Sequence, residues 1–193
     1  MGNLSMSNIR KRKLDIEFYT ISRTGETVRA GDSVLIESSE PHTRPSVGVI
    51  KKLESEKEGN ITVDVRWYHR PEETSFGRRV FQGARELFLS DQYETLSANR
   101  IMRKCFVHSL KDYNKLEKIR PLVYYSRFKY KVGTNKFTPD CVSVYCKCEM
   151  PYNPDNLMIQ CDDCNDWFHP GCVKMTTEQA EQLSNYICDE CSS

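Results

Sequence analysis

The sequence lacks the features of a membrane or secreted protein. Its apolar runs are only a few residues long, far short of the roughly 20 residues that a membrane-spanning helix needs. Its opening residues, MGNLSMSN, contain no apolar core of a signal peptide. We therefore expect a protein that stays inside the cell and has no membrane partner.

Motifs of catalysis are also missing. The sequence has no Gly-rich loop of the kind that cradles a phosphate. His42, His69 and His108 lie apart in the sequence and have no companion nucleophile motif. We predict that the protein is not an enzyme.

Arginine is absent from the last quarter of the chain. Residues 141–193 contain two lysines and nine acidic residues, a net charge of −7, whereas residues 1–140 carry +8. Such an asymmetry predicts different partners for the two parts. We expect the acidic part to meet a cationic partner and the basic part to lie near nucleic acid.

The basic excess includes a run of four cations near the amino terminus, Arg10 to Lys13. Residues 1–17 show no apolar periodicity, so we predict a mobile tail. Its cations suit a nuclear localisation signal or a contact with DNA phosphate. A merely solvated terminus fits the composition equally well.

Cysteine, in contrast, is abundant and regularly spaced. Seven of the nine cysteines form, with one histidine, four close pairs of ligands. Thiolate and imidazole at these spacings suit tetrahedral zinc, and eight ligands make two closed sites without an open position for a catalytic water. We predict two structural zinc ions, and the spacing leaves open whether each takes sequential or alternating pairs. The ligands are Cys146, Cys148, Cys161, Cys164, His169, Cys172, Cys188 and Cys191.

Two cysteines, Cys105 and Cys141, fall outside this pattern. We expect both to be small buried hydrophobic residues.

The region from about residue 18 to 140 has the pattern of a β-rich domain. Short β-prone runs alternate with Gly, Pro and Asn, which predicts a mainly β fold, a twisted sheet or partly closed barrel with few helices. The long polar connection between Pro71 and Arg85 is of a length that is often functional. The predicted strands are 33–37, 47–53, 61–68, 86–89, 105–108 and 123–130.

These runs carry a family resemblance. In order, the phrases GDSVLIE, PSVGVIKKLE, VDVRWYHRPEET, RELFLSD, KCFVHSL and YYSRFKY resemble a bromo-adjacent homology (BAH) domain over about residues 25–132. The resemblance implies a β-rich chromatin module that binds histone tails or other proteins. We assign residues 18–140 to it.

The cysteine-rich segment, residues 141–193, resembles a plant homeodomain (PHD) finger. Four cysteines, one histidine and three cysteines follow in that order, with Trp167 two residues before His169 and Tyr186 two before Cys188. The resemblance implies a cross-brace, with Cys146, Cys148, His169 and Cys172 on one zinc and the other four ligands on the second. A RING-like ubiquitin ligase is the alternative from another class, although RING ligases usually place their histidine fourth. The connector 138–145 is too short for a flexible tether, so we expect the two modules to pack together.

Matching to PHD readers of histone H3 trimethylated on lysine 4 implies a methyl-lysine cage. Its walls would be Tyr145, Tyr152, Met158 and Trp167, which attract a trimethylammonium group through cation–π and polarizable contacts. The histone tail would add a strand along Leu157 to Cys161, including Ile159. Asp155, Asp162 and Asp163 would pair with the tail's arginine, and carbonyls near Asn185 and Tyr186 would hold its amino terminus. We expect Phe168 and Ile187 to pack inside the finger.

The two modules in this order resemble the plant chromatin readers of the Early Bolting in Short Days and Short Life family. That resemblance implies a nuclear protein of transcriptional regulation, with the histone H3 tail, the nucleosome and chromatin-modifying complexes as partners. It also implies a second cage in the BAH domain, for trimethylated lysine 27, at Ser46, Trp67 and His69. The family has tyrosines where this chain has Ser46 and His69, which predicts a weakened cage. Weaker reading of lysine 27, a changed ligand, and a scaffold that does not discriminate methylation remain the alternatives.

Overall fold

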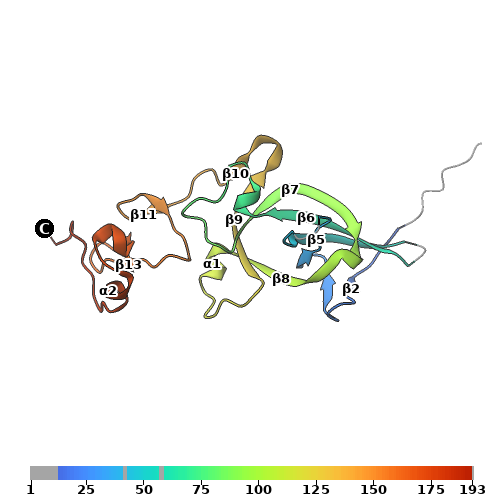
Figure 1. Cartoon of the computed structure of the whole chain (residues 1–193), viewed down its shortest axis with the longest axis horizontal. Helices are drawn as coiled ribbons and strands as arrows, with labels where there is room; N and C mark the ends of the chain where they lie inside the picture. The colour runs from blue at the N-terminus through green and yellow to red at the C-terminus, as the bar shows by residue number, and fades with distance from the viewer. Residues whose placement is uncertain (1–12, 41–42, 57–58, 193) are drawn as a thin grey trace, which may run out of the picture.

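The computed structural model describes residues 13–40, 43–56 and 59–192. It consists of a β-barrel domain and a small carboxyl-terminal finger, and Figure 1 shows them side by side along the long axis of the molecule. None of the helices in the described ranges is long and apolar enough to span a membrane. The expected mainly β fold is confirmed.

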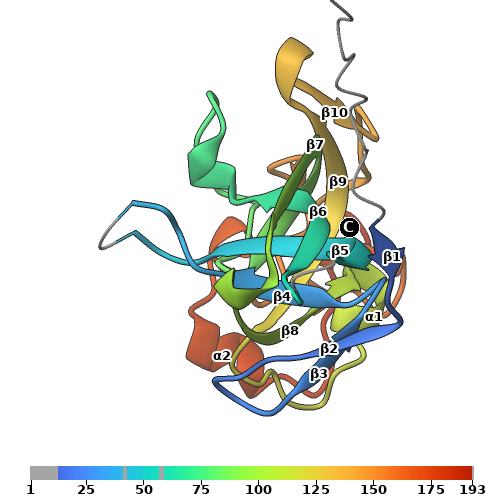
Figure 2. The same cartoon turned by 90° about the vertical axis from the view of Figure 1, so that its right-hand side faces the viewer.

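The barrel forms because one long sheet closes on itself. In the described residues the sheet has the order β1-β5-β4-β8-β9-β7-β6, and β6 pairs again with β5. Figure 2, which views the molecule from the barrel end, shows these strands crossing at angles around the core. The barrel strands are β4 (Ser33–Ile36), β5 (Ser46–Ser55), β6 (Ile61–His69), β7 (Glu86–Ser97), β8 (Ile101–Ser109) and β9 (Val123–Lys131).

Each of the six predicted strands lies within one of these barrel strands or ends within one residue of it, but β7 is much longer than predicted. Its second half, from Ser90 to Ser97, is largely exposed and polar, and it forms a strand because it pairs with β6 from Arg66 to Thr62. A local pattern of hydrophobicity cannot reveal such a partner.

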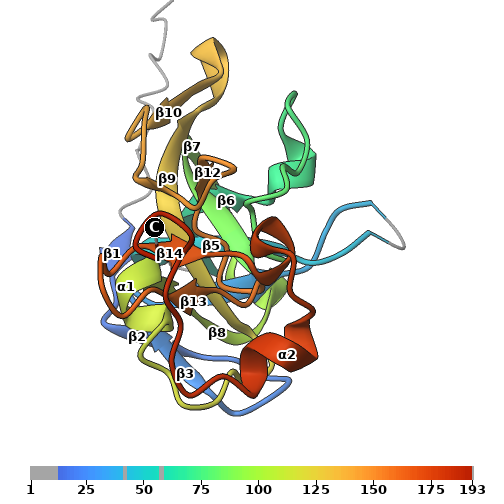
Figure 3. The same ribbon diagram turned by 90° about the vertical axis from the view of Figure 1, so that its left-hand side faces the viewer.

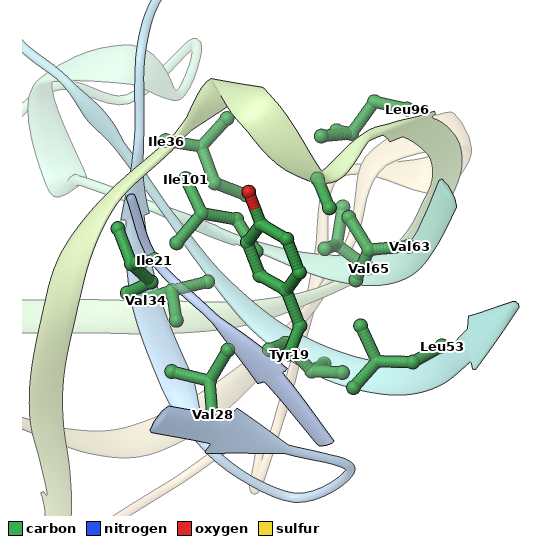
Figure 4. Close-up of a cluster of buried hydrophobic side chains, with 12 residues drawn as sticks. Tyr19, Ile21, Val28, Val34, Ile36, Leu53, Val63, Val65, Leu96 and Ile101 are labelled. Carbon is green, nitrogen blue, oxygen red and sulfur yellow. The ribbon is translucent and has the colours of Figure 1, made fainter. Parts of the chain in front are cut away.

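Alternation along the strands places the barrel core. Val63 and Val65 of β6 are fully buried, while their neighbours are only partly so. They join side chains from the short strands β2 (Phe18–Thr20) and β3 (Thr27–Arg29) in one cluster. Tyr19 of β2 crosses this cluster in Figure 4. The hydroxyl of Tyr19 donates to Asn99 Oδ1 at 3.2 Å, so its polar end is satisfied at the edge of the core.

The expected tail over residues 1–17 is wrong in its last part. Leu14–Asp15 form strand β1, which pairs with β5, and Lys13 lies 3.5 Å from Glu54. Backbone pairing with the long strand β5 orders a segment that has no apolar periodicity of its own. Arg10, Lys11 and Arg12 lie outside the described residues.

The remaining elements of the barrel domain are short. They are the helix α1 (Leu110–Tyr113), the strand β10 (Lys136–Thr138), which pairs with β9, and the 3₁₀ turns η1 (Pro71–Glu73), η2 (Ala98–Arg100) and η3 (Val132–Thr134). Helix α1 begins after Ser109, whose hydroxyl accepts the N–H of Asp112 and caps it. It lies at the end of the barrel that faces the finger (Figure 1).

The finger contains only short pieces of regular structure. Two two-stranded sheets and one helix surround a small core in which Phe168 and Tyr186 meet edge to face at 5.9 Å. Figure 3, seen from the finger end, shows these pieces around a mostly irregular chain. They are β11 (Val144–Tyr145), β12 (Met150–Pro151), β13 (Ile159–Gln160), β14 (Trp167–Phe168), η4 (Pro170–Val173) and α2 (Thr177–Glu181).

The two parts are joined by direct hydrogen bonds, as expected from the short connector. Arg127 Nη1 donates to the carbonyl of Tyr152 at 2.6 Å, and Asn153 Nδ2 donates to that of Val80 at 2.9 Å. Ala84 N donates to Asp155 Oδ2 at 2.6 Å. The long connection after Pro71 therefore serves, through residues 80–84, as a docking segment for the finger.

Candidate zinc sites and ligand cavities

The eight predicted zinc ligands gather into two groups of four. In each group the ligand atoms lie within 4.8 Å of one another, so each group could hold one zinc ion. The pairs alternate along the chain, which is the cross-braced arrangement that the family resemblance implies. One group is Cys146, Cys148, His169 and Cys172, and the other is Cys161, Cys164, Cys188 and Cys191.

In each group one thiol, Cys146 or Cys161, lies where its surroundings stabilise the thiolate. Burial alone would raise the pKa of Cys146, but backbone N–H groups of Cys148 and His169, with side-chain contacts from His169 and Cys172, lower that pKa to about 6. Cys161 shows the same balance, and N–H groups that include that of Cys188 lower its pKa to about 6. Stabilised thiolates are the form that binds zinc. Zinc held there would be structural, because four protein ligands close its coordination.

The two cysteines outside the clusters differ. Cys105 is buried, as expected, and burial raises the pKa of its thiol to about 12. Cys141 is exposed, so the expectation of a buried residue is wrong for it. It lies in the connector between barrel and finger, which crosses the surface.

The four predicted cage residues line one cavity of about 670 Å³. Trp167 is 40% exposed and Met158 is 9% exposed, so the tryptophan stands at the mouth and the methionine lies deeper. Tyr145 is placed by β11 directly before the first zinc ligand, and Trp167 by β14 two residues before the histidine ligand. The cavity is lined by Asn114, Tyr145, Tyr152, Pro154, Asp155, Asn156, Leu157, Met158 and Trp167.

Two of the residues predicted to contact a peptide tail lie at the cavity and on strand β13. Leu157 is 40% exposed at the cavity, and Ile159 lies in β13, whose one described partner strand is β14. The other edge of β13 could therefore accept an added strand. Asp162 Oδ2 accepts the N–H of Tyr186 at 2.9 Å, so it also supports the finger's own fold.

Four other residues of the finger bear on the predicted contacts and packing. Asp163 and Asn185 are exposed and stay predicted contacts. Phe168 is buried, as expected, whereas Ile187 is 45% exposed, so the expectation that it packs inside the finger is wrong. Ile187 precedes the ligand Cys188, whose N–H donates to Cys161 Sγ at 3.3 Å. Tyr186, packed against Phe168, and the ligand Cys188 hold the segment on either side of Ile187, whose own side chain is not needed for packing.

The three residues predicted for the second cage also line one pocket, of about 350 Å³, on the barrel. Trp67 stands opposite Gly48 in the β5–β6 pairing, packs against the core on one side, and donates through Nε1 to Glu94 Oε2 at 3.2 Å. His69 Nε2 lies 3.0 Å from Gln92 Oε1. Tyr68 borders the pocket but packs against the separate cluster around Leu35, and burial raises its pKa.

Several residues of both sites could not be found from the sequence pattern. Glu73 and Glu94 bring two carboxylates to the barrel pocket and Arg100 brings one cation, and Glu94 arrives there through pairing of β7 with β6. Asn114, at the end of α1, lines the finger's cavity although it belongs to the barrel domain. These neighbours are distant in the sequence, and no local signal marks them.

Comparison with known proteins adds three findings. The model of the BAH domain family matches residues 26–140 and that of the PHD-finger family matches residues 146–191. The chain is 51% identical to the chromatin remodeling protein EBS of Arabidopsis thaliana, over 97% of this chain and 80% of that protein. It is 45% identical to the chromatin remodeling protein SHL of the same plant, over 92% and 78%.

More distant similarities concern one part each. A lysine-specific demethylase 7A of Xenopus tropicalis is 48% identical over 48 residues, which are 25% of this chain and 5% of that protein. The crystal structure of the yeast Rsc2 BAH domain superposes with a TM-score of 0.54 at 19% identity, over 65% of this chain and 54% of that one. At that identity the likeness shows the fold alone.

Proposed function

Because the chain belongs to the family of chromatin proteins in which a BAH domain precedes a PHD finger, we propose that it is a nuclear, non-enzymatic reader of methylated histone tails. Its finger binds histone H3 trimethylated on lysine 4. The observation that carries this proposal is the cavity that brings Tyr145, Tyr152, Met158 and Trp167 together.

The chemistry of this cavity suits a quaternary ammonium group. A trimethylammonium cannot donate hydrogen bonds and is cheap to desolvate, so ring faces and a thioether can surround it without loss. Each ring face contributes about 1–2 kcal/mol of cation–π attraction when water is excluded. The net charge of −7 over residues 141–193 further favours a cationic tail.

The tail's backbone would pair with the open edge of β13, next to the cavity. Strand addition contributes backbone hydrogen bonds, and the cavity selects the side chain that enters it. We assign Asp162 and Asp163 to the tail's arginine, which they would meet in charge-assisted hydrogen bonds.

Titration of the intact protein with lysine-4 peptides that carry zero to three methyl groups tests this function. We expect affinity to rise with methylation and Trp167→Ala to remove most of the gain. Ile187→Ala, a change at another exposed apolar residue of the finger, should leave binding within about twofold, as for a site outside the interface. Binding that ignores methylation, or that survives Trp167→Ala, would refute the proposal.

For the barrel we propose a weakened second reading site. Its pocket offers one aromatic wall, Trp67, beside Ser46, His69 and the carboxylates of Glu73 and Glu94. Glu94 favours a cation, but Arg100 also lines the pocket, Glu73 is paired with Arg70 at 3.0 Å, and the pocket lacks the ring faces that select trimethylation. We expect peptides trimethylated on lysine 27 to bind much more weakly than lysine-4 peptides, and equal affinities would contradict this.

A further inference from the structure

The finger's cavity crosses the boundary between the two domains. Asn114, the residue that ends α1, lines it together with the finger's Tyr145 and Trp167. Figure 1 shows α1 at the end of the barrel nearest the finger. A ligand in the cavity would therefore lie against both domains.

A carboxylate of this cavity is held by the barrel. Asp155, which lines the cavity, accepts the N–H of Ala84 on Oδ2 at 2.6 Å. Its own N–H donates to Asn153 Oδ1 at 3.0 Å, and Asn153 is buried and donates in turn to the carbonyl of Val80. The docking segment, residues 80–84, thus determines where the charge of Asp155 lies.

The docking segment is itself tightly packed at Gly83. A Cβ on Gly83 would lie 2.7 Å from the hydroxyl of Tyr125 and 2.9 Å from Asp155 Oδ2. The N–H of Gly83 donates to that hydroxyl at 3.1 Å, and the hydroxyl donates to the buried Glu86 at 3.2 Å. Only glycine allows the backbone to come this close, so Ala84 can reach Asp155.

The charge of Asp155 acts on the cavity wall. Burial raises the pKa of the Tyr152 hydroxyl, and the negative charge of Asp155 raises it further. Asp155 has the same effect on Tyr113, next to Asn114, where burial is again the larger cause. A carboxylate has two acceptor oxygens, so the bond from Ala84 to Oδ2 leaves Oδ1 for a ligand.

We propose that the barrel completes the finger's methyl-lysine cavity, with Asn114 as a wall and Asp155, held by Ala84, as a residue that sets the preference among methylation states. This inference rests on the proposed function of the same cavity. Dimethyllysine keeps one N–H, which Asp155 can accept in a charge-assisted bond. Trimethyllysine has no N–H and gains only the attraction of the charge. Asp155 therefore narrows the difference in affinity between trimethyllysine and dimethyllysine peptides.

Calorimetric titration of the full chain with lysine-4 dimethyl and trimethyl peptides tests the role of Asp155. Asp155→Asn should weaken dimethyl binding about tenfold and trimethyl binding about threefold, since a hydrogen bond to a charged group is lost only for the former. Glu178→Gln makes the same change of charge on α2, away from the cavity lining. It should change the affinities for the dimethyl and trimethyl peptides by less than about twofold. Equal losses for the two peptides, or no loss, would overturn the assignment.

The role of the barrel is tested by displacing the docking segment. Gly83→Ala should reproduce the unequal losses of Asp155→Asn, whereas Gly133→Ala, at a glycine with open space around it, should not. Asn114→Ala, at an exposed position, keeps the test valid if Gly83→Ala fails to fold, and it should weaken both peptides by about threefold, as for a lost wall contact. Unchanged binding by Asn114→Ala would exclude a two-domain cavity. A wild-type protein that ignores methylation would instead refute the proposed function itself.

Discussion

The barrel and the finger hold their cavities by different forces. Among the described residues the main core cluster of the barrel contains twelve buried side chains, whereas that of the finger contains four, two of them zinc-ligand cysteines. In the barrel one side of a pocket wall, Trp67, packs against the core of the sheet. A finger of about 50 residues has only a small core in which such a wall could be buried. The finger can therefore leave Tyr152 and Trp167 at a cavity while its ligand clusters keep the loops in place.

In these two domains the more tightly packed frame does not carry the more aromatic pocket. The barrel pocket lies on a well-packed sheet and takes one aromatic wall from Trp67, with Tyr68 and His69 at its border. The finger's cavity takes three rings and a thioether from short strands and loops. A stable frame is thus no guide to which pocket suits a methylated ligand. The side chains at a few positions decide it.

The largest difference between the domains should appear when metal is removed. A zinc chelator should unfold the finger and leave the barrel folded, because structural zinc supplies about 10–16 kcal/mol in small zinc-finger peptides. Each domain contains one of the two tryptophans, Trp67 and Trp167. Fluorescence of Trp67→Phe and Trp167→Phe variants would follow each domain separately. Simultaneous unfolding of both domains would show that the barrel also depends on zinc.

The next largest effect concerns the buried ion pair beneath the docking segment. Arg127→Leu leaves Glu86, which is fully buried, without the partner that lies 2.6 Å away, and should cost the barrel about 3–5 kcal/mol in denaturant unfolding. The double variant Glu86→Leu/Arg127→Leu should recover much of this loss, because no charge stays unpaired.

The same pair predicts a pH dependence. Burial raises the pKa of Glu86 and Arg127 opposes that shift, so without Arg127 the folded protein binds a proton more tightly than the unfolded chain does. The stability of Arg127→Leu, relative to the double variant, should therefore rise as pH falls through the folded pKa of Glu86. A flat difference between the two variants across pH would contradict this reading.

A smaller effect would come from rebuilding the barrel pocket. Ser46→Tyr with His69→Tyr adds two ring faces beside Trp67, and each should contribute about 1–2 kcal/mol toward a trimethylammonium. We expect lysine-27 peptide binding to tighten about tenfold or more, measured by titration. Trp67→Ala in the rebuilt pocket should reverse the gain, and no gain at all would mean that the pocket has taken another ligand.

The smallest effect should follow Met158→Leu in the finger's cavity. The exchange conserves volume, so stability should fall by less than about 1.5 kcal/mol. Loss of the polarizable sulfur should weaken lysine-4 trimethyl binding by a few tenths of a kcal/mol to about 1 kcal/mol. A loss as large as that of Trp167→Ala would show that Met158, only 9% exposed, has a packing role beyond that of a wall.

Prediction from the sequence succeeded where the signal is local. The spacing of the cysteines, the alternation of β6 and the turns before Ser33 and Ile61 each depend on a few consecutive residues, and the structure has the corresponding elements. It failed where a distant partner decides the outcome. Leu14 lies in a strand because it pairs with β5, and Ser90–Ser97 extend β7 because they pair with β6. Ile187, which we expected to pack inside the finger, is exposed beside a predicted metal ligand.

Periodicity and short spacing are properties of neighbouring residues, so the sequence pattern alone predicts four pairs of zinc ligands and a β-rich domain. The division of the ligands between two ions and the four candidate walls were implied by the family resemblance. Only the tertiary structure decided that Asn114 borders the finger's cavity and that Ala84 holds Asp155. These contacts join residues about 30 to 70 positions apart, which lie together only in the folded chain, where the docking segment packs closely at Gly83. The physical reason is that a hydrogen bond across domains leaves no pattern in either segment alone.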